Sequence, residues 1–202
     1  MDSPVEYIEP FRGLSRLPEG FKGRRVRREL SDVVAVVVHQ TAVRGGFGVT
    51  QSAVRRSGSE TMARVGRYQN TPYHGIYSPR DRASIVQWPV WVHSYHGNRS
   101  NAYSLGWSYD GKLPGDALDV EQAQLSLAHL VSVGREFGAP LQYVEAHRQH
   151  SAQRGGDPGQ AIWQRVVVPM LSKLGLATRP AHTTGDGLPL PDSWTVDTPS
   201  VS

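Results

Sequence analysis

The stretch VVAVVVHQTA at residues 33–42 is the expected centre of the fold. Its first six residues, Val33 to Val38, are all apolar and mostly β-branched, which favours a strand buried on both faces over a helix. His39 follows at the point where the strand gives way to a loop. An imidazole at this position is either a hydrogen-bonded structural residue or a metal ligand, and the strand alone does not separate the two.

A second stretch, EAHRQHSAQRGGDPG at residues 145–159, supplies two further groups that bind metals. His147 ends a short apolar run, a polar loop follows, and Asp157 comes just before Pro-Gly and a helical pattern. Neutral imidazole and carboxylate oxygen both bind zinc, and a catalytic zinc site has three protein ligands and one open position. His147 and Asp157 therefore need a third ligand, and His39 is the best candidate.

The rest of the chain predicts an α/β fold with a mixed central β-sheet of about five or six strands, flanked by helices. Strands are expected at residues 73–78 and 84–88, paired as an antiparallel hairpin, and at 104–109 and 141–147. One helix or two short ones are expected at 51–68. Further helices are expected at 120–137, between an Asp119 N-cap and Gly138, and at 159–174, where Pro169 should interrupt the helix. This architecture places the zinc site in a groove at the sheet edge.

Taken together, these motifs resemble a family: the zinc-dependent N-acetylmuramoyl-L-alanine amidases, which share a fold with phage amidase lysozymes and peptidoglycan recognition proteins. The matching pieces are VVVHQTA (36–42), TPYHGIYS (71–78), SIVQWP (84–89), HGN (96–98), SLGW (104–107) and AHRQHSAQRGGDPGQAIW (146–163). They occur in the family order, and the resemblance extends over roughly residues 24–175. The first and last pieces are most similar to a phage-type branch.

The resemblance implies that the protein hydrolyses the amide bond between N-acetylmuramic acid and L-alanine in peptidoglycan. It makes His39, His147 and Asp157 the ligands of a Zn²⁺ cofactor, and Tyr73 the hydroxyl that assists at the metal. The implied substrate contacts are His96, Asn98 and Trp107. A histidine in the position of His96 is also compatible with a structural role at the rim of the sheet.

Two positions depart from the family pattern. Many relatives have a lysine two residues before the ligand Asp, where this chain has Gly155, and some have a glutamate where it has Ser108. Arg154, next to Gly155, is a candidate for the missing positive charge. Glu145 lies two positions before His147, so on a strand it shares that ligand's face. It is a candidate general base or ligand partner, or an exposed carboxylate with neither role.

Three classes of function remain open from the sequence. The first is the amidase, the second a module that binds peptidoglycan without cutting it, and the third a structural component of a phage or phage-like particle. The departures at Gly155 and Ser108 favour the second class, whereas a complete set of three ligands favours the first.

Length, composition and charge restrict the domain organisation, the types of metal ligand and the class of binding partner. The 202 residues are expected to form an N-terminal lead-in (1–23), a catalytic domain (24–176) and a C-terminal tail (177–202) that is either disordered or docked through Trp194. There is no cysteine, so thiolate metal ligands are excluded. The basic excess, 22 Lys and Arg against 18 Asp and Glu, is concentrated near residues 22–28 but lacks the features of a nucleic-acid reader.

No stretch has the length of a signal peptide's apolar region or of a membrane span. The family resemblance implies bacterial peptidoglycan as the partner, and we expect no nucleic acid and no membrane insertion. We expect the protein to be made in the cytoplasm and to reach the cell wall through lysis, a phage or injection-system particle, or a secretion system.

Overall fold

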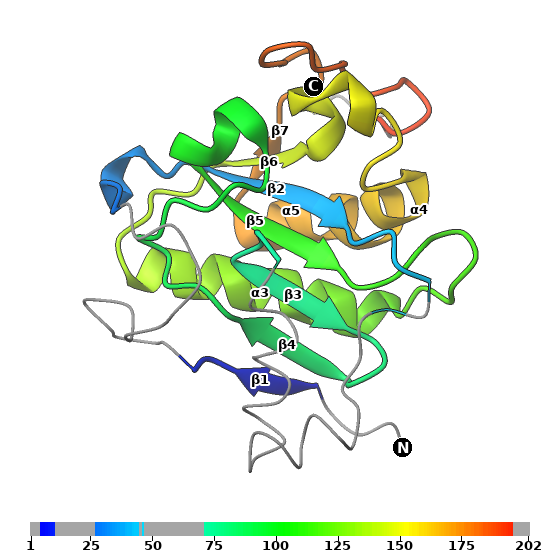
Figure 1. The fold of residues 1–202 in the computed structure, drawn as a ribbon, viewed down its shortest axis with the longest axis horizontal. Coiled ribbons are helices and arrows are strands. Elements are labelled where there is room, and N and C mark those ends of the chain that lie inside the picture. Colours follow the sequence, from blue (N-terminus) through cyan, green and yellow to red (C-terminus); the bar gives the residue numbers. More distant parts are fainter. Residues whose placement is uncertain (1–4, 11–26, 45, 47–70, 196–202) are drawn as a thin grey trace.

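The computed structural model describes residues 5–10, 27–44, 46 and 71–195, and within them seven strands form one mixed sheet (Figure 1). The strands are β1 (Glu6–Ile8), β2 (Ala35–Gln40), β3 (Gly75–Ser78), β4 (Ala83–Val86), β5 (Ser104–Tyr109), β6 (Tyr143–Ala146) and β7 (Ala177–Thr178). Their order is β1-β4-β3-β5-β2-β6-β7. All neighbours are parallel except β3 and β4, which form the predicted antiparallel hairpin. The predicted α/β class is thereby confirmed, with more strands than the five or six expected.

Strand β2 lies between β5 and β6 and is buried almost along its whole length. Val36 and Val38 belong to the main hydrophobic core. Side chains alternate between the two faces of a strand, so Val37 and His39 point to the opposite face. The strand begins later than predicted and includes His39, whose side chain is therefore held by the sheet and not by a loop.

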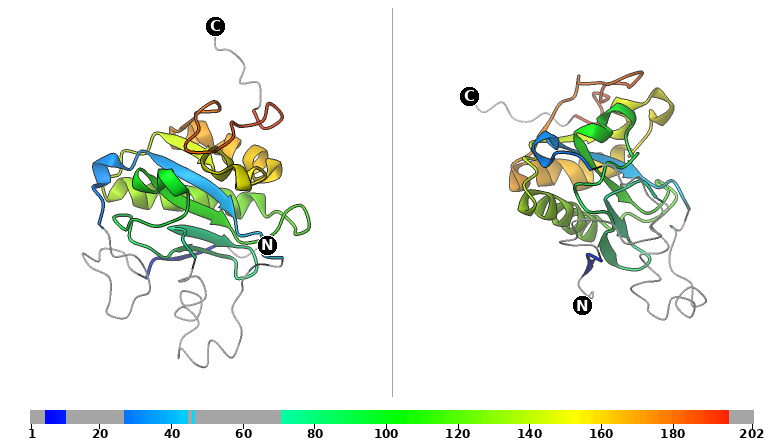
Figure 2. Two further views of the ribbon diagram at one scale, coloured as in Figure 1. Left: turned by 45° about the horizontal axis from the view of Figure 1, so that its top comes forward. Right: turned by 60° about the vertical axis from the view of Figure 1, so that its left-hand side comes forward.

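Helices cover the face to which Val36 and Val38 point. The helical segments are α3 (Val120–Glu136), α4 (Gln160–Ile162), α5 (Leu171–Leu174), η1 (Leu30–Asp32), η2 (Asn98–Ala102), η3 (His147–His150), η4 (Ala152–Arg154), η5 (Trp163–Val167) and η6 (Val168–Met170). Figure 1 and both views of Figure 2 show α3 and α5 along the same side of the sheet. Asp119 caps α3 as predicted, because its carboxylate accepts a hydrogen bond from the Gln122 amide. The predicted helix over 159–174 is broken into α4, η5, η6 and α5, with Pro169 inside η6.

The opposite face of the sheet carries short turns instead of long helices. Segment η2 contacts β5, and η3 contacts both β2 and η2. His39 of β2 and its register partner Ser108 of β5 lie on this face of the sheet. The candidate site is therefore built between the sheet and a layer of loops.

The two ends of the described chain are part of the domain. Residues of β1 pair with β4, so part of the expected lead-in belongs to the sheet. After the expected boundary at residue 176, β7 pairs with β6 and continues the sheet. The C-terminal tail was expected to be either disordered or docked through Trp194. The side chain of Trp194 is buried, and its ring centroid lies 6.4 Å from that of Trp163, as the docked alternative requires.

The helix expected at 51–68 lies outside the described residues. In the part of the chain that the structure describes, no helix has the length and apolarity to cross a membrane.

Candidate metal centre

His39, His147 and Asp157 come together at one point. One ligand atom from each lies within 4.8 Å of the other two, and no other such metal-binding group is found among the described residues. The Nδ1 atom of His147 is 2.8 Å from Oδ2 of Asp157, and Nδ1 of His39 is 3.8 Å from the same oxygen. The three residues predicted as ligands thus converge on a single site.

The parallel pairing of β2 and β6 explains the position of the two histidines. Val38 pairs with Ala146, so His39 and His147 each occupy the next position at the same end of the sheet. The site therefore lies at the carboxyl ends of two neighbouring central strands, at the edge of the sheet where both strands end, as expected from the sequence.

Contacts with backbone amides hold Asp157 against β2 and η3. Its carbonyl accepts a hydrogen bond from the Arg148 amide at 3.1 Å, which ties the polar loop back to η3. Its Oδ1 accepts one from the Gln40 amide at 2.8 Å. The loop of residues 147–157 thereby returns the carboxylate to the position beside His39.

The donor set fits a zinc ion. Nδ1 of His39 is buried and has no hydrogen-bond partner among the described residues, an arrangement that a bound cation would resolve. Two imidazoles and one carboxylate are common zinc ligands. The side chain of His39 is fully buried, whereas those of His147 and Asp157 are each 12% exposed, so solvent reaches the site from their side.

Both His39 and Asp157 are held in the protonation state that binds a metal. Burial, followed by the charge of His147, lowers the pKa of His39 to about 3, which keeps its imidazole neutral. Burial alone would raise the pKa of Asp157, but the hydrogen bond from His147 and the charges of His39 and His147 outweigh it and lower the pKa to about 2. Metal ligands must be deprotonated in this way.

Tyr73 lies beside the three residues, with its ring centroid 4.8 Å from that of His39. Burial, and then the charge of Asp157, raises the pKa of Tyr73 to about 12, while Arg154 and a hydrogen bond with Ser108 act in the opposite direction. Its hydroxyl therefore stays protonated. Ser108 pairs with His39 in the sheet register, so the position of the relatives' glutamate lies directly at this site. Arg154 itself is exposed.

His96 does not have the predicted position in a substrate groove. The residue is only 3% exposed, and its Nδ1 lies 3.3 Å from Nε2 of His39. Its Nε2 lies 3.1 Å from the carbonyl oxygen of Ser104. His96 therefore packs behind a candidate ligand, and the predicted substrate contact is corrected to a buried partner of His39.

Trp107 is also corrected. Its side chain is fully buried, and its indole N–H donates a hydrogen bond to Ser126 of α3 at 3.1 Å. Alternation along β5 places Trp107 on the helix-covered face, opposite to Ser108. It is a core residue, out of reach of a substrate at the metal centre.

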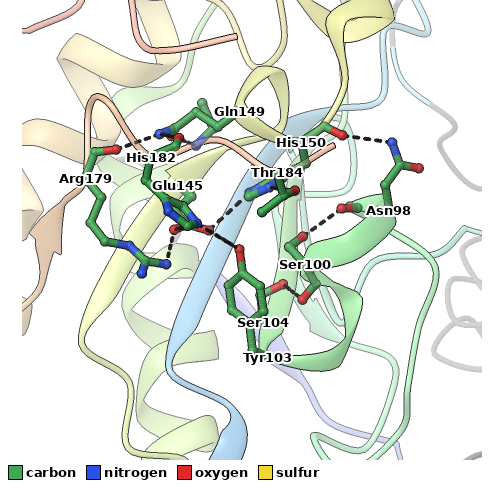
Figure 3. Close-up of polar contacts among 12 residues, drawn as sticks. Asn98, Ser100, Tyr103, Ser104, Glu145, Gln149, His150, Arg179, His182 and Thr184 are labelled. Atoms are coloured by element: carbon green, nitrogen blue, oxygen red, sulfur yellow. Dashed lines mark hydrogen bonds and ion pairs between the residues drawn. The ribbon is translucent and has the colours of Figure 1, made fainter. Parts of the chain in front are cut away.

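Glu145 is fully buried and forms the centre of a different network (Figure 3). One carboxylate oxygen forms an ion pair with Arg179, and the other lies 3.1 Å from Nε2 of His150 and 3.2 Å from the Tyr103 hydroxyl. Both oxygens are engaged and neither is open to solvent. The predicted roles of Glu145 as a general base or as an exposed carboxylate are therefore wrong.

Asn98 is exposed, and its side-chain amide donates to the carbonyl of His150 at 3.0 Å (Figure 3). This contact links η2 to η3. Its role as a substrate contact stays a prediction.

The C-terminal segment contributes residues that the sequence did not single out. Gln149 donates to the carbonyls of Arg179 and His182, and His150 lies 2.9 Å from the Thr184 hydroxyl (Figure 3). The signal for this in the sequence is the second histidine of the AHRQH motif, which follows the candidate ligand His147. The segment braces the turn that carries His147.

Comparison with known proteins identifies the fold. No family model and no curated protein matches the sequence. Solved structures do match. The endolysin N-acetylmuramoyl-L-alanine amidase LysCS from Clostridium intestinale URNW is 14% identical, with a TM-score of 0.53 over 87% of this chain and 99% of that one. Drosophila PGRP-LB is 14% identical, with a TM-score of 0.54 over 86% of this chain and 96% of that one.

The Ph2119 endolysin from a Thermus scotoductus bacteriophage is 15% identical, with a TM-score of 0.50 over 85% of this chain and 100% of that one. Identities this low speak for the fold alone. The chain thus has the fold shared by N-acetylmuramoyl-L-alanine amidase endolysins and peptidoglycan recognition proteins.

Proposed function

We propose that the protein is a zinc-dependent peptidoglycan amidase that hydrolyses the bond between N-acetylmuramic acid and L-alanine. The observation that carries the proposal is the convergence of His39, His147 and Asp157, with an unpartnered, buried Nδ1 on His39. A protein that only binds the cell wall has no need for these three groups at one point.

In this proposal the three residues hold the metal, and Tyr73 acts on the substrate. Zinc bound there would polarise the scissile carbonyl and lower the pKa of a water ligand. The protonated hydroxyl of Tyr73 donates a hydrogen bond to the oxygen that becomes negatively charged as the amide is attacked. Arg154 adds positive charge near Tyr73 and, because a guanidinium stays protonated, it acts only electrostatically.

The proposed partner is bacterial peptidoglycan, approached from the side on which His147 and Asp157 are partly exposed. Access to the cell wall would follow release by lysis or delivery by a particle or secretion system. Asn98 is a proposed contact for the substrate.

A second candidate is a peptidoglycan-binding module without catalysis. It is favoured by Gly155 and Ser108, which stand where catalytic relatives have a lysine and a glutamate. Among the described residues, Glu145 is not available to replace that glutamate, because its carboxylate is buried in the ion pair with Arg179.

Elemental analysis combined with dye release from labelled sacculi tests the proposal. We expect about one zinc per chain in the purified protein. Replacing His39, His147 or Asp157 with Ala should remove both zinc and activity. Asp186→Ala is a matched control, because Asp186 is exposed in the C-terminal segment outside the metal group. Full zinc content in all three ligand variants would overturn the site. Zinc without dye release would favour the binding module.

A further inference from the structure

We propose that His96 is a positioning residue that fixes the tautomer of His39 and thereby directs the Nδ1 lone pair of His39 at the metal. The inference rests on the metal centre proposed above. It gives His96 a role in metal binding that differs from contact with the substrate.

The first step is the state of the His96 ring. Its Nε2 is 3.1 Å from the Ser104 carbonyl oxygen, which can only accept a hydrogen bond. The Ser104 hydroxyl lies 3.4 Å from the same nitrogen and donates its own hydrogen to the Ser100 carbonyl (Figure 3), so toward His96 it also only accepts. Nε2 of His96 therefore carries the hydrogen, and Nδ1 of the neutral ring is an acceptor.

The second step is the effect of the His96 tautomer on the tautomer of His39. Nε2 of His39 is 3.3 Å from Nδ1 of His96 and must donate the hydrogen between them. Neutral imidazole has one N–H, so Nδ1 of His39 keeps its lone pair. This is the buried atom without a hydrogen-bond partner among the described residues, and it faces Asp157 at 3.8 Å. A backbone carbonyl of β5 thus determines which nitrogen of His39 can bind a metal.

The surroundings keep the His96 ring in place. The Arg28 guanidinium donates to the Ser104 carbonyl at 2.6 Å and to the Asn101 carbonyl at 2.8 Å, which holds the accepting oxygen in position. On the other side the ring lies against Gly106, where an added Cβ would be 2.5 Å from Cγ of His96. Any larger residue at 106 would displace the ring.

Loss of the His96 acceptor should therefore weaken metal binding. Without it, His39 is free to adopt the tautomer that carries hydrogen on Nδ1 and points it at the Asp157 carboxylate, which blocks coordination. Residues that orient a metal-binding histidine typically change metal affinity about 10- to 100-fold when they are replaced.

Zinc affinity, measured by competition with a chelating dye, tests this with two variants. His96→Leu removes both ring nitrogens and should weaken zinc binding by about 10- to 100-fold. His96→Asn retains an acceptor oxygen near the position of Nδ1 and should recover most of the affinity. Thermal unfolding of the zinc-free proteins shows whether each variant is folded. Parent-like zinc affinity in folded His96→Leu, or no recovery in folded His96→Asn, would overturn the inference.

Nitrogen-15 NMR of the zinc-free parent tests the tautomer without any substitution. The inference expects His39 protonated on Nε2 and His96 protonated on Nε2. Protonation of His39 on Nδ1 would refute it. A parent protein that shows the expected tautomers but binds no zinc would instead contradict the proposed function, so the two failures are distinguishable.

Discussion

Tyr73 lies against His39, and its raised pKa keeps the phenol protonated at any pH at which the protein would act. A hydrogen bond made only to the developing oxyanion lowers the barrier without strengthening substrate binding. We therefore expect Tyr73→Phe to lower kcat by on the order of a hundredfold, with little change in KM or zinc content. Dye release from sacculi at several substrate concentrations, together with elemental analysis, measures all three quantities.

Tyr7→Phe is the matched control, because Tyr7 lies on β1 and is 51% exposed. It should cleave at the parent rate. If Tyr73→Phe also cleaves at the parent rate, Tyr73 is a packing residue and the hydrogen-bond donor is another group.

Individual site residues were predictable where the motif fixes both the residue type and the strand end, as for His39 and His147. The substrate contact predicted for Trp107 was not found. Alternation along β5 puts Trp107 and Ser108 on opposite faces of the sheet, but the sequence does not show which face α3 covers. His96 and Glu145 failed for a related reason. Their partners His39 and Arg179 lie 57 and 34 residues away in the sequence, and only the fold brings them together.

At the level of elements, the ion pair of Glu145 with Arg179 joins β6 to the C-terminal segment. Burial alone would raise the pKa of Glu145, but the hydrogen bond and charge of His150, together with Arg179, lower it. A carboxyl whose pKa is lowered by folding stabilises the folded state above its unfolded pKa, and this contribution is lost as the pH falls through the folded value. Glu145→Gln should therefore lower the free energy of unfolding by roughly 3 kcal/mol at neutral pH.

Urea unfolding of the zinc-free parent and Glu145→Gln at a series of pH values measures this effect. The difference between the two proteins should shrink as the pH falls below the ordinary Glu value of 4.5. Glu121→Gln is the control, because Glu121 is exposed on α3, and it should have little effect at any pH. A Glu145→Gln difference that is constant with pH would show that the ion pair contributes nothing.

Trp194 provides the apolar anchor of the same segment. Its ring packs near Trp163, and the Arg148 guanidinium lies 5.3 Å from the ring centroid. Trp194→Ala removes this buried contact and should cost about 3 kcal/mol of unfolding free energy. Urea unfolding followed by circular dichroism checks it. An unchanged midpoint would mean that the segment adds no stability to the domain.

The longer elements were predictable because their patterns are long. The apolar run of β2, the hairpin of β3 and β4, and the capped helix α3 all have a clear period or turn signal. The short edge strands β1 and β7 were not predictable, since two or three residues carry no period. From the sequence, the segment between His147 and Asp157 was predicted only as a polar loop, and the turns η3 and η4 within it were not recognised.

At the scale of the whole molecule, the fold brings the candidate ligands together but does not decide between cutting and binding. The same fold occurs in endolysin amidases and in peptidoglycan recognition proteins. In the proposed function, the chemistry depends on His39, His147, Asp157 and Tyr73, and Gly155 and Ser108 are the two departures from the family pattern. The identity of the reaction products therefore shows whether the protein cleaves peptidoglycan or only binds it more directly than further structural similarity does.

Mass spectrometry of sacculi digested with the zinc-loaded protein tests the central claim most directly. The account predicts released stem peptides with a free L-alanine amino terminus, and glycan strands whose muramic acid bears a free lactyl carboxylate. Both products should be absent from a digest with His147→Ala. Muramic acid that remains fully joined to L-alanine, after treatment with parent protein carrying about one zinc per chain, would contradict the account.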